Sequence, residues 1–409
     1  MFHFTGGKMV RNLRVLVLPL IVLTVGLAGR PVPQPANHLP FPQQPPAPLR
    51  FTLGGNATEI PATFIDSLVF LPVHVNQSEP SLFELDSAAA VSSIDPDRAM
   101  EIGIGRTPVP VLNLSGVDIS LGSLAETTKK DFAAYVGRPY EGTIGNDVLA
   151  DAVVEIDYAR QTVRLYDPAT YQYSGRGKSL HLSLASGEPV VQAKFTETNG
   201  KTFEGNFGVD TALDASIVIS GKFGQMHHLH FARTKTIPAT DIELGGVQQP
   251  VFARIMQVSV GPYDVRDPIA VFSRGDSSAD DKSRLAGQLG GKLLRRFTVT
   301  FDYPHQRMIL DPNSDFRTDD LEDMSGLAVV ATGSNLKSFE VTEVRSGTPG
   351  ADAKIQKGDV IAGVDDEAAA DLSLTAIRKL FRQRGAKYKL LIQRNRQTLA
   401  VTLQTRRLL

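Results

Sequence analysis

Short apolar runs separated by polar turns dominate the chain, and this pattern is typical of β-strands rather than of long helices. Residues 68–75 and 82–85 form two such runs. Together they predict a hairpin that delivers Asp86 to a turn. The many glycines and prolines between such runs favour the same interpretation, so we expect a mainly β protein.

A second hairpin of the same design is predicted ahead of Asp210. Its strands are residues 190–196 and 203–209, and Asn199–Gly200 lies between them. The Asn-Gly pair favours a tight hairpin because both residues tolerate positive φ. The chain therefore carries two carboxylates, each at the end of an apolar strand and each followed by a hydroxyl residue and an alanine.

Further landmarks recur in the same order in the two halves of the chain. The matched segments are residues 83–88 with 207–212, 118–122 with 241–245, and 142–161 with 287–306. Chance similarity rarely preserves the order of several landmarks, so the repeat predicts two homologous lobes. Each lobe is expected to close with a β-hairpin, and short helices are expected at residues 146–151 and 291–296.

Composition narrows the classes of function. The 409 residues include no cysteine, which excludes thiol nucleophiles, disulfides and thiolate metal sites. A net charge of −1 provides no electrostatic reason to expect nucleic acid as a partner. A hydrophobic content of 42% in a chain of this length is enough for two or three cores.

The N-terminus has the features of a targeting segment. Lys8, Arg11 and Arg14 precede an apolar run over residues 15–28, so residues 1–29 are expected to be a secretory signal peptide. The alternative is an uncleaved anchor that attaches the protein to the membrane. Residues 30–49 are rich in proline and are expected to form an extended linker. This arrangement favours export to a bacterial periplasm or cell envelope, or secretion.

The Asp-Ser-Ala and Asp-Thr-Ala motifs, each followed later by an apolar-Gly pair at Ile144–Gly145 and Leu289–Gly290, resemble those of the retropepsin-like aspartic proteases. The resemblance implies two acid-protease lobes at residues 50–175 and 176–315. It also implies a catalytic dyad of Asp86 and Asp210, supported by the hydroxyls of Ser87 and Thr211. The implied activity is hydrolysis of peptide bonds in peptide or protein substrates, without a metal or other cofactor.

The chemistry of such a dyad follows from electrostatics. Two carboxylates about 3 Å apart cannot both ionise cheaply, so they share one proton. The ionised member can act as a general base on water while the protonated member donates to the amide carbonyl.

The chain departs from the family at Ala88 and Ala212, where the motifs normally have glycine. Alanine fits with little strain if φ is negative, whereas positive φ would make an inactive site credible. The alternative is therefore a catalytically inactive protease-like scaffold or peptide-binding protein, and another alternative is that each lobe pairs with a second chain.

Residues 316–409 resemble a bacterial PDZ domain. The segments that carry this resemblance are 325–330, 339–344, 346–353, 357–361 and 372–380. The resemblance implies a groove that binds a free C-terminus or an extended segment as an added strand. It places the carboxylate-binding loop at Ser325, Gly326, Leu327 and Ala328, with Ile377 and Leu374 facing the groove. The alternative is an empty groove in a domain that only packs against the lobes.

Other candidate sites have weaker support. His227, His228 and His230 lack a helix-spaced pair with a glutamate, so an exposed loop is expected there rather than a metal site. Asp214 is expected to be solvated or structural, and the alternatives are contact with substrate or a salt bridge within the lobe. Hairpins near residues 115–116 and 240–246 are candidates for segments that cover a substrate, with plain solvent hairpins as the alternative.

Overall fold

Strand burial follows the alternation expected from the sequence, and strands make up most of the regular structure. In β30 (Lys387–Arg394), for example, Tyr388, Leu390 and Ile392 point into a core while the side chains between them are more exposed. The structure is a computed structural model, which describes residues 49–104, 110–185, 187–229, 235–238, 250–273 and 285–409. The expected signal peptide and almost all of the expected linker lie outside the described residues.

The first lobe contains strands β1 (Arg50–Phe51), β2 (Ala57–Pro61), β3 (Thr63–Ile65), β4 (Leu68–Val75), β5 (Ser81–Leu85), β6 (Ser93–Ile94), β7 (Val111–Leu114), β8 (Val117–Ser120), β9 (Ala125–Glu126), β10 (Gly142–Ile144), β11 (Val153–Asp157) and β12 (Thr162–Tyr166), and helices α1 (Pro96–Glu101), α2 (Lys130–Val136) and α3 (Asn146–Leu149). The expected hairpin before Asp86 is present as β4 and β5, which pair antiparallel. The helix expected at residues 146–151 is present and ends earlier, at Leu149.

The second lobe contains strands β13 (Lys178–His181), β14 (Ser183–Ala185), β15 (Glu188–Thr196), β16 (Thr202–Asp210), β17 (Ile217–Ile219), β18 (Thr236–Pro238), β19 (Val251–Arg254), β20 (Gln257–Val260), β21 (Tyr263–Arg266), β22 (Ile269–Phe272), β23 (Gly287–Gly290), β24 (Phe297–Asp302) and β25 (Arg307–Pro312), and helices α4 (Gly221–Met226) and α5 (Gly291–Leu294). Its β15–β16 hairpin delivers Asp210, as β4 and β5 deliver Asp86.

The two lobes repeat one topology around their aspartates. In the first lobe, β10 pairs parallel with β5 on one side and antiparallel with β6 on the other. In the second lobe, β23 pairs parallel with β16 and antiparallel with β17. Each apolar-Gly motif therefore runs beside the strand that carries the aspartate. The fold is mainly β, and its sheets are arranged as the internal repeat predicted.

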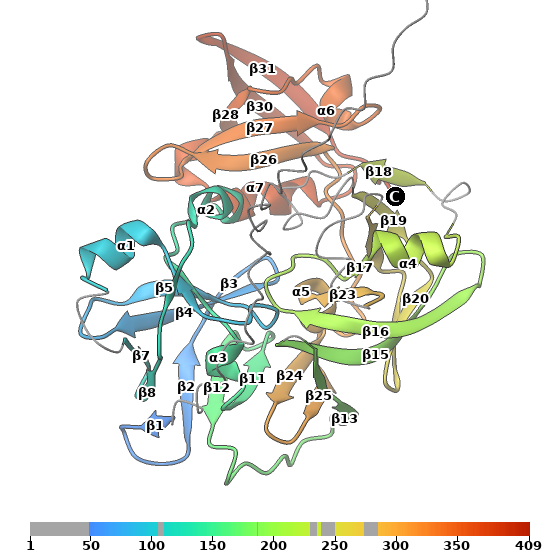
Figure 1. Ribbon diagram of the computed structural model, residues 1–409. Coiled ribbons are helices and arrows are strands. Elements are labelled where there is room, and N and C mark those ends of the chain that lie inside the picture. Colours follow the sequence, from blue (N-terminus) through green and yellow to red (C-terminus); the bar gives the residue numbers. More distant parts are fainter. Residues whose placement is uncertain (1–48, 105–109, 186, 230–234, 239–249, 274–284) are drawn as a thin grey trace, which may run out of the picture. The chain divides into compact units, whose positions relative to one another are not determined.

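The closing hairpins of the two lobes join into one sheet. Strand β11 of the first lobe pairs antiparallel with β24 of the second along its full length, and the two strands lie side by side in Figure 1. The strand order of this sheet is β13-β25-β24-β11-β12-β2. The lobes thus pair with each other through backbone hydrogen bonds within one chain.

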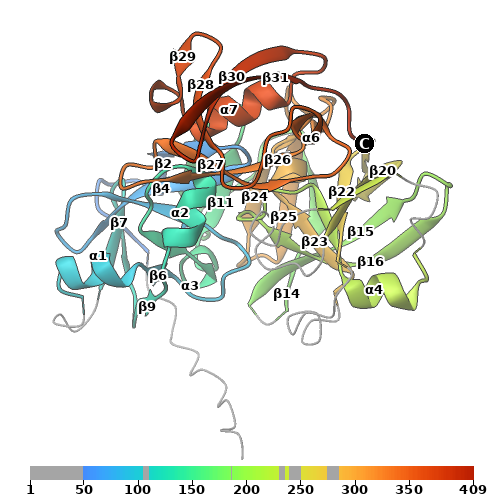
Figure 2. The ribbon, with the colours of Figure 1, turned by 90° about the horizontal axis from the view of Figure 1, so that it is seen from above.

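A C-terminal domain follows, with its own sheet and its own core. It contains strands β26 (Leu327–Thr332), β27 (Ser338–Val344), β28 (Val360–Val364), β29 (Glu367–Ala368), β30 and β31 (Gln397–Gln404), helices α6 (Pro349–Asp352) and α7 (Leu374–Phe381), and a 3₁₀ turn at Ala369–Asp371. Strand β26 forms one edge of this sheet. Figure 2 shows α7 lying against this sheet, and the apolar face of α7 contributes Leu374, Ile377 and Phe381 to the core.

The chain from Pro45 to Leu409 forms one compact unit. Residues 316–322, which precede the C-terminal domain, are bound to the second lobe. Asp320 accepts hydrogen bonds from the Ser216 hydroxyl and from the Ile269 amide, and Glu322 pairs with Arg254. None of the described helices is long and apolar enough to span a bilayer.

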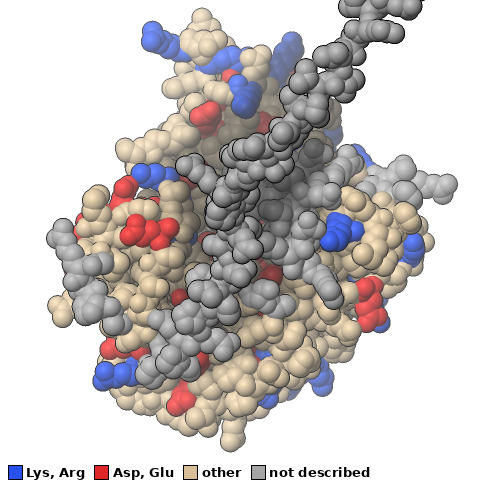
Figure 3. All heavy atoms as spheres, viewed as in Figure 1, with Lys and Arg blue, Asp and Glu red and all other residues tan. Residues whose placement is uncertain are grey.

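Acidic and basic side chains are interspersed on the face shown in Figure 3, in keeping with the small net charge.

Two glycines of the repeat have a clear packing role. A Cβ on Gly145 would lie 2.8 Å from the Ala89 carbonyl oxygen, and a Cβ on Gly290 would lie 2.4 Å from the Ala215 carbonyl oxygen. Gly145→Ala and Gly290→Ala are therefore each expected to lower the free energy of unfolding by about 1–3 kcal/mol, the usual cost of overpacking. Urea denaturation monitored by circular dichroism measures this loss.

Gly224→Ala is the matched control for both substitutions. Gly224 lies within α4, and a Cβ added there would meet nothing closer than Leu229 at 3.8 Å. Alanine has the higher helix propensity, so this variant is expected to be neutral or more stable by up to about 1 kcal/mol. Equal losses in all three variants would contradict the packing role of the repeat glycines.

Candidate functional site

The two aspartate loops are joined by a reciprocal set of hydrogen bonds between the lobes. The Ser87 amide donates to the Thr211 hydroxyl at 3.0 Å, and the Thr211 amide donates to the Ser87 hydroxyl at 3.1 Å. Each hydroxyl also donates across the lobe boundary at 2.6 Å, Ser87 to the Val209 carbonyl and Thr211 to the Leu85 carbonyl. Both side chains are fully buried. The structure thus brings the two predicted loops together.

Each carboxylate is held by backbone amides of its own loop. Asp86 Oδ1 accepts from the amides of Ala88 and Ala89 at 2.8 and 3.0 Å. Asp210 Oδ1 accepts from the Ala212 amide at 2.8 Å. Neither Ala88 nor Ala212 is among the described residues with positive φ. The methyl groups therefore cause no backbone strain of the left-handed kind, and the amides reach the carboxylates as glycine amides would.

The two aspartates influence each other electrostatically. Burial raises the pKa of Asp210 well above its ordinary value, and the negative charge of Asp86 raises it further. Burial also raises the pKa of Asp86, while the Ala88 and Ala89 amides and Lys129 act in the opposite direction. Both residues remain partly open to solvent. A pair of this kind retains a proton over a wider pH range than isolated carboxylates do.

A second carboxylate lies close to each aspartate. Glu84 is only 4% exposed, and its pKa is raised well above the ordinary value by burial and then by Asp86 and Asp210. In the second lobe the position that matches Glu84 is Gly208, and the space beside it holds Glu188. Burial and the charge of Asp86 raise the pKa of Glu188, which accepts a hydrogen bond from Gln288 at 3.1 Å.

A buried lysine accompanies Glu84. Lys129 is 9% exposed, and its Nζ donates to the Thr143 hydroxyl at 2.8 Å and to the Ser93 hydroxyl at 3.0 Å. Burial lowers its pKa, whereas Glu84, Asp86 and Asp95 act to raise it. Lys129 is therefore the cation that acts on Asp86, opposing the effect of burial.

Sequence reasoning missed these neighbours of Asp86 and Asp210. Glu84 had a usable signal, because a charged residue inside an otherwise apolar strand requires a partner or a function. Lys129 had none, because it lies in a polar stretch whose pattern predicts exposure.

Asp214 is a buried connector rather than a solvated residue. It accepts a hydrogen bond from the Ser67 hydroxyl at 2.6 Å and forms an ion pair with Lys292 at 3.3 Å. Burial opposes ionisation of Asp214, yet Lys292, Arg382 and the Ser67 hydroxyl together lower its pKa below the ordinary value. The predicted alternative of a salt bridge within the second lobe is thus present, and it extends to the other parts of the chain.

The predicted carboxylate-binding loop of the C-terminal domain is closed on itself. The amides of Ser325 and Gly326 donate to Asp323 Oδ1 at 2.9 and 2.8 Å, and the Leu327 amide donates to the Ser325 hydroxyl at 3.1 Å. Ala328 is buried at the start of β26. Ile377 is fully buried in the core of the domain.

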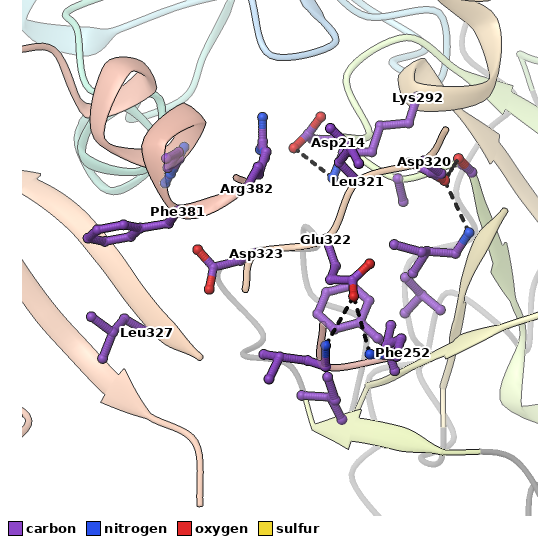
Figure 4. Close-up of a pocket in the computed structure, with 18 of the residues that line it drawn as sticks. Asp214, Phe252, Lys292, Asp320, Leu321, Glu322, Asp323, Leu327, Phe381 and Arg382 are labelled. Atoms are coloured by element: carbon purple, nitrogen blue, oxygen red, sulfur yellow. Dashed lines mark hydrogen bonds and ion pairs between the residues drawn. The ribbon is translucent and has the colours of Figure 1, made fainter. Parts of the chain in front are cut away.

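A cavity of about 100 Å³ lies beside this loop, between the second lobe and the C-terminal domain. Figure 4 shows Leu327 and Phe381 on the side of the C-terminal domain, Phe252 and Lys292 on the side of the second lobe, and Asp323 between them. Ile377 does not line this cavity, whereas Arg378, Phe381 and Arg382 of the same helical region do.

The remaining predictions concern the two hairpins that could cover a substrate and the segment with three histidines. The turn at residues 115–116 is held against the N-terminal strands, since the Ser115 and Gly116 carbonyls accept from Thr58 and Thr52. The segment 240–246 lies outside the described residues. His227 packs against Phe223, and no group of potential metal ligands is found within the part of the chain that the structure describes. His230 is outside that part.

Comparison with known proteins identifies the C-terminal domain. The PDZ domain family matches residues 318–393, so the chain contains a PDZ domain, a class of module that binds peptide or protein ligands. No curated protein matches the chain.

The hydroxyl exchange between the lobes is testable by substitution. Thr211→Val keeps the shape of the side chain and leaves the Ser87 amide and the Leu85 carbonyl without their partner. Each unsatisfied buried group costs about 1–3 kcal/mol, so urea denaturation is expected to show a loss of at least that size. Thr211→Ser keeps the hydroxyl and should retain most of the stability. Equal losses in both variants would contradict the role assigned to the hydroxyl.

The effect of Lys129 on the pKa of Asp86 is testable by titration. Lys129→Met removes the positive charge that lowers the pKa of Asp86, so the titration midpoint of Asp86 is expected to move to higher pH. Carbon-13 NMR of protein labelled at the aspartate carboxyls measures this shift directly. Lys130→Met is the matched control, because Lys130 is 74% exposed and pairs with Asp97. An unmoved or lowered midpoint in Lys129→Met would refute the assignment.

Proposed function

We propose that the protein is an aspartic endopeptidase in which Asp86 and Asp210 activate a water molecule for hydrolysis of peptide bonds. The reciprocal bonds between Ser87 and Thr211 carry this proposal, because they hold the two aspartate loops against each other across the lobe boundary. The ionised member of the pair takes a proton from water, and the protonated member donates to the substrate carbonyl. The resemblance of the two sequence motifs to those of retropepsin-like proteases supports the same assignment.

The alternative is a protease-like scaffold that binds peptides without cleaving them. Alanine in place of glycine in both motifs motivated this alternative. Ala88 and Ala212 do not have positive φ, and their backbone amides donate hydrogen bonds to Asp86 and Asp210. Both observations favour an active enzyme over a scaffold. The raised pKa of Asp210 beside Asp86 also suits a dyad that retains one proton.

The substrate class follows from the same site together with the PDZ domain. An aspartic dyad cleaves extended chains, and a PDZ domain binds extended segments or free C-termini. We infer that the substrates are unfolded or extended protein segments. We further propose that the protein acts in a bacterial periplasm or cell envelope, an assignment supported by the charged and apolar N-terminal segment.

Cleavage by the purified protein tests the proposal. The full-length chain is expected to cleave an unstructured protein at acidic to neutral pH, and Asp86→Asn and Asp210→Asn should each abolish cleavage because one carboxylate cannot serve as both acid and base. Asp264→Asn is the control, since Asp264 is exposed on β21 in the second lobe. Mass spectrometry of the products measures the outcome.

Two results would decide against the enzyme. Cleavage that persists in Asp86→Asn would remove the dyad from the mechanism. Absence of cleavage at every pH, with peptide binding retained, would establish the scaffold.

A further inference from the structure

Helix α2 of the first lobe lies at the place where a PDZ ligand is added. It packs against β26, and β26 is the edge strand of the PDZ sheet. Helix α7 also contacts β26. Figures 1 and 2 both show α2 next to this strand. A peptide bound by a PDZ domain forms an added strand along such an edge, beside the helix. In this structure the position beside β26 is therefore taken by α2, a segment of the same chain.

Side-chain contacts fasten α2 to both walls of the groove. The guanidinium of Arg378 on α7 lies 4.4 Å from the ring centre of Tyr135 on α2 and donates to the Val329 carbonyl of β26 at 3.1 Å. At the end of α2, a Cβ on Gly137 would lie 2.7 Å from Leu374 Cβ on α7. Leu374 is accordingly only 1% exposed.

Lys129 at the other end of α2 lies beside the dyad. It directly precedes the helix, its backbone amide donates to Asp95, and its Nζ donates to Ser93 and Thr143. A lysine ammonium has no acceptor for the free N–H groups of a helix, so α2 has no side-chain cap at its N-terminus. A helix of seven residues without a side-chain cap at its N-terminus is held mainly by packing. Ala133, Tyr135 and Val136 of α2 also pack with Phe70 and Tyr140 of the first lobe, so loss of the PDZ contacts removes one of the two sets of contacts that hold α2 and Lys129 in place.

A second connection runs from the other aspartate loop to the PDZ domain. Asp214, in the loop that begins at Asp210, accepts from Ser67, and the Tyr135 hydroxyl lies 3.4 Å from its other carboxylate oxygen. Asp66, the neighbour of Ser67, pairs with Arg382 of the PDZ domain at 2.6 Å. Figure 4 shows Arg382 and Lys292 on opposite sides of Asp214. Both aspartate loops are thus linked to the groove.

We propose that α2 is the resident occupant of the PDZ groove between β26 and α7, and that an extended, mainly apolar peptide segment entering this groove displaces α2 and withdraws Lys129 from Asp86. The apolar character follows from the groove walls, Leu327, Val329, Leu374 and Phe381. The binding of this segment and the state of the dyad are then coupled, because α2 connects them. This inference rests on the proposed function for its consequence in catalysis, whereas displacement of α2 is independent of it.

Substitution of Tyr135 tests the proposal, because its ring is the contact between α2 and Arg378 on α7. Tyr135→Ala removes this contact, whereas Tyr135→Phe keeps the ring and is the matched control. The probe is a library of short random peptides with free C-termini, and hydrogen exchange of residues 129–137 is followed in parallel.

The expected result is that the wild-type protein captures apolar peptides and that Tyr135→Ala captures them at least about tenfold more tightly, because α2 is then easier to displace. A captured peptide is expected to speed hydrogen exchange in α2 and to move the Asp86 carbon-13 titration to higher pH, as Lys129→Met does. Tyr135→Phe should retain the affinity of the wild-type protein.

Several outcomes would overturn the proposal. These are equal peptide capture by Tyr135→Ala and Tyr135→Phe, no capture by any form, and capture without faster exchange in α2. Failure of the proposed function gives a different pattern, in which the wild-type protein cleaves nothing while peptide capture and α2 exchange still depend on the Tyr135 contact. That pattern would support displacement of α2 in a scaffold.

Discussion

The exchange of hydroxyl and amide hydrogen bonds between Ser87 and Thr211 is the constraint on which the rest of the structure depends. Each residue satisfies a buried amide of the other lobe and also donates to a carbonyl there. Neither loop can satisfy its buried polar groups alone, so the two lobes are required to meet at this point. The carboxylates of Asp86 and Asp210 then face a common environment because their neighbours in sequence are locked together.

Ionised carboxylates are costly to bury, and four carboxyl groups lie close together around this junction. Glu84 and Glu188 lie near the two aspartates, and all four carboxyl pKa values are raised, with burial as the largest cause. Lys129 supplies positive charge to one side of this cluster. Such an environment favours neutral carboxylic acids at a pH where exposed ones are ionised, and acid–base chemistry needs a carboxylic acid of this kind.

Much of this arrangement follows from the sequence by periodicity. The two hairpins, the duplicated motifs and the apolar-Gly strands were all predictable, because each depends on a local pattern of apolar residues, turn residues and glycine. The packing role of Gly145 and Gly290 does not follow from the sequence pattern, because it depends on the close approach of each glycine to a carbonyl group of an aspartate loop.

Long-range pairings were not predictable in the same way. Nothing in the pattern of residues 316–322 distinguishes a free linker from the docked segment formed by Asp320 and Glu322. The burial of Lys129 and the packing of α2 on β26 likewise depend on residues far away in sequence. Contacts of this kind depend on the tertiary structure, and the local pattern of apolar and polar residues does not predict them.

The sheet shared by β11 and β24 has a consequence for synthesis of the chain. Strand β11 is complete well before β24 emerges, so a nascent first lobe carries an open strand edge that only the later lobe can cover. An open edge of apolar residues is a template for pairing with other chains. Until translation has passed residue 302, the partner for that edge could equally be the second lobe of a neighbouring molecule, and exchange of lobes between two chains would satisfy the same backbone hydrogen bonds.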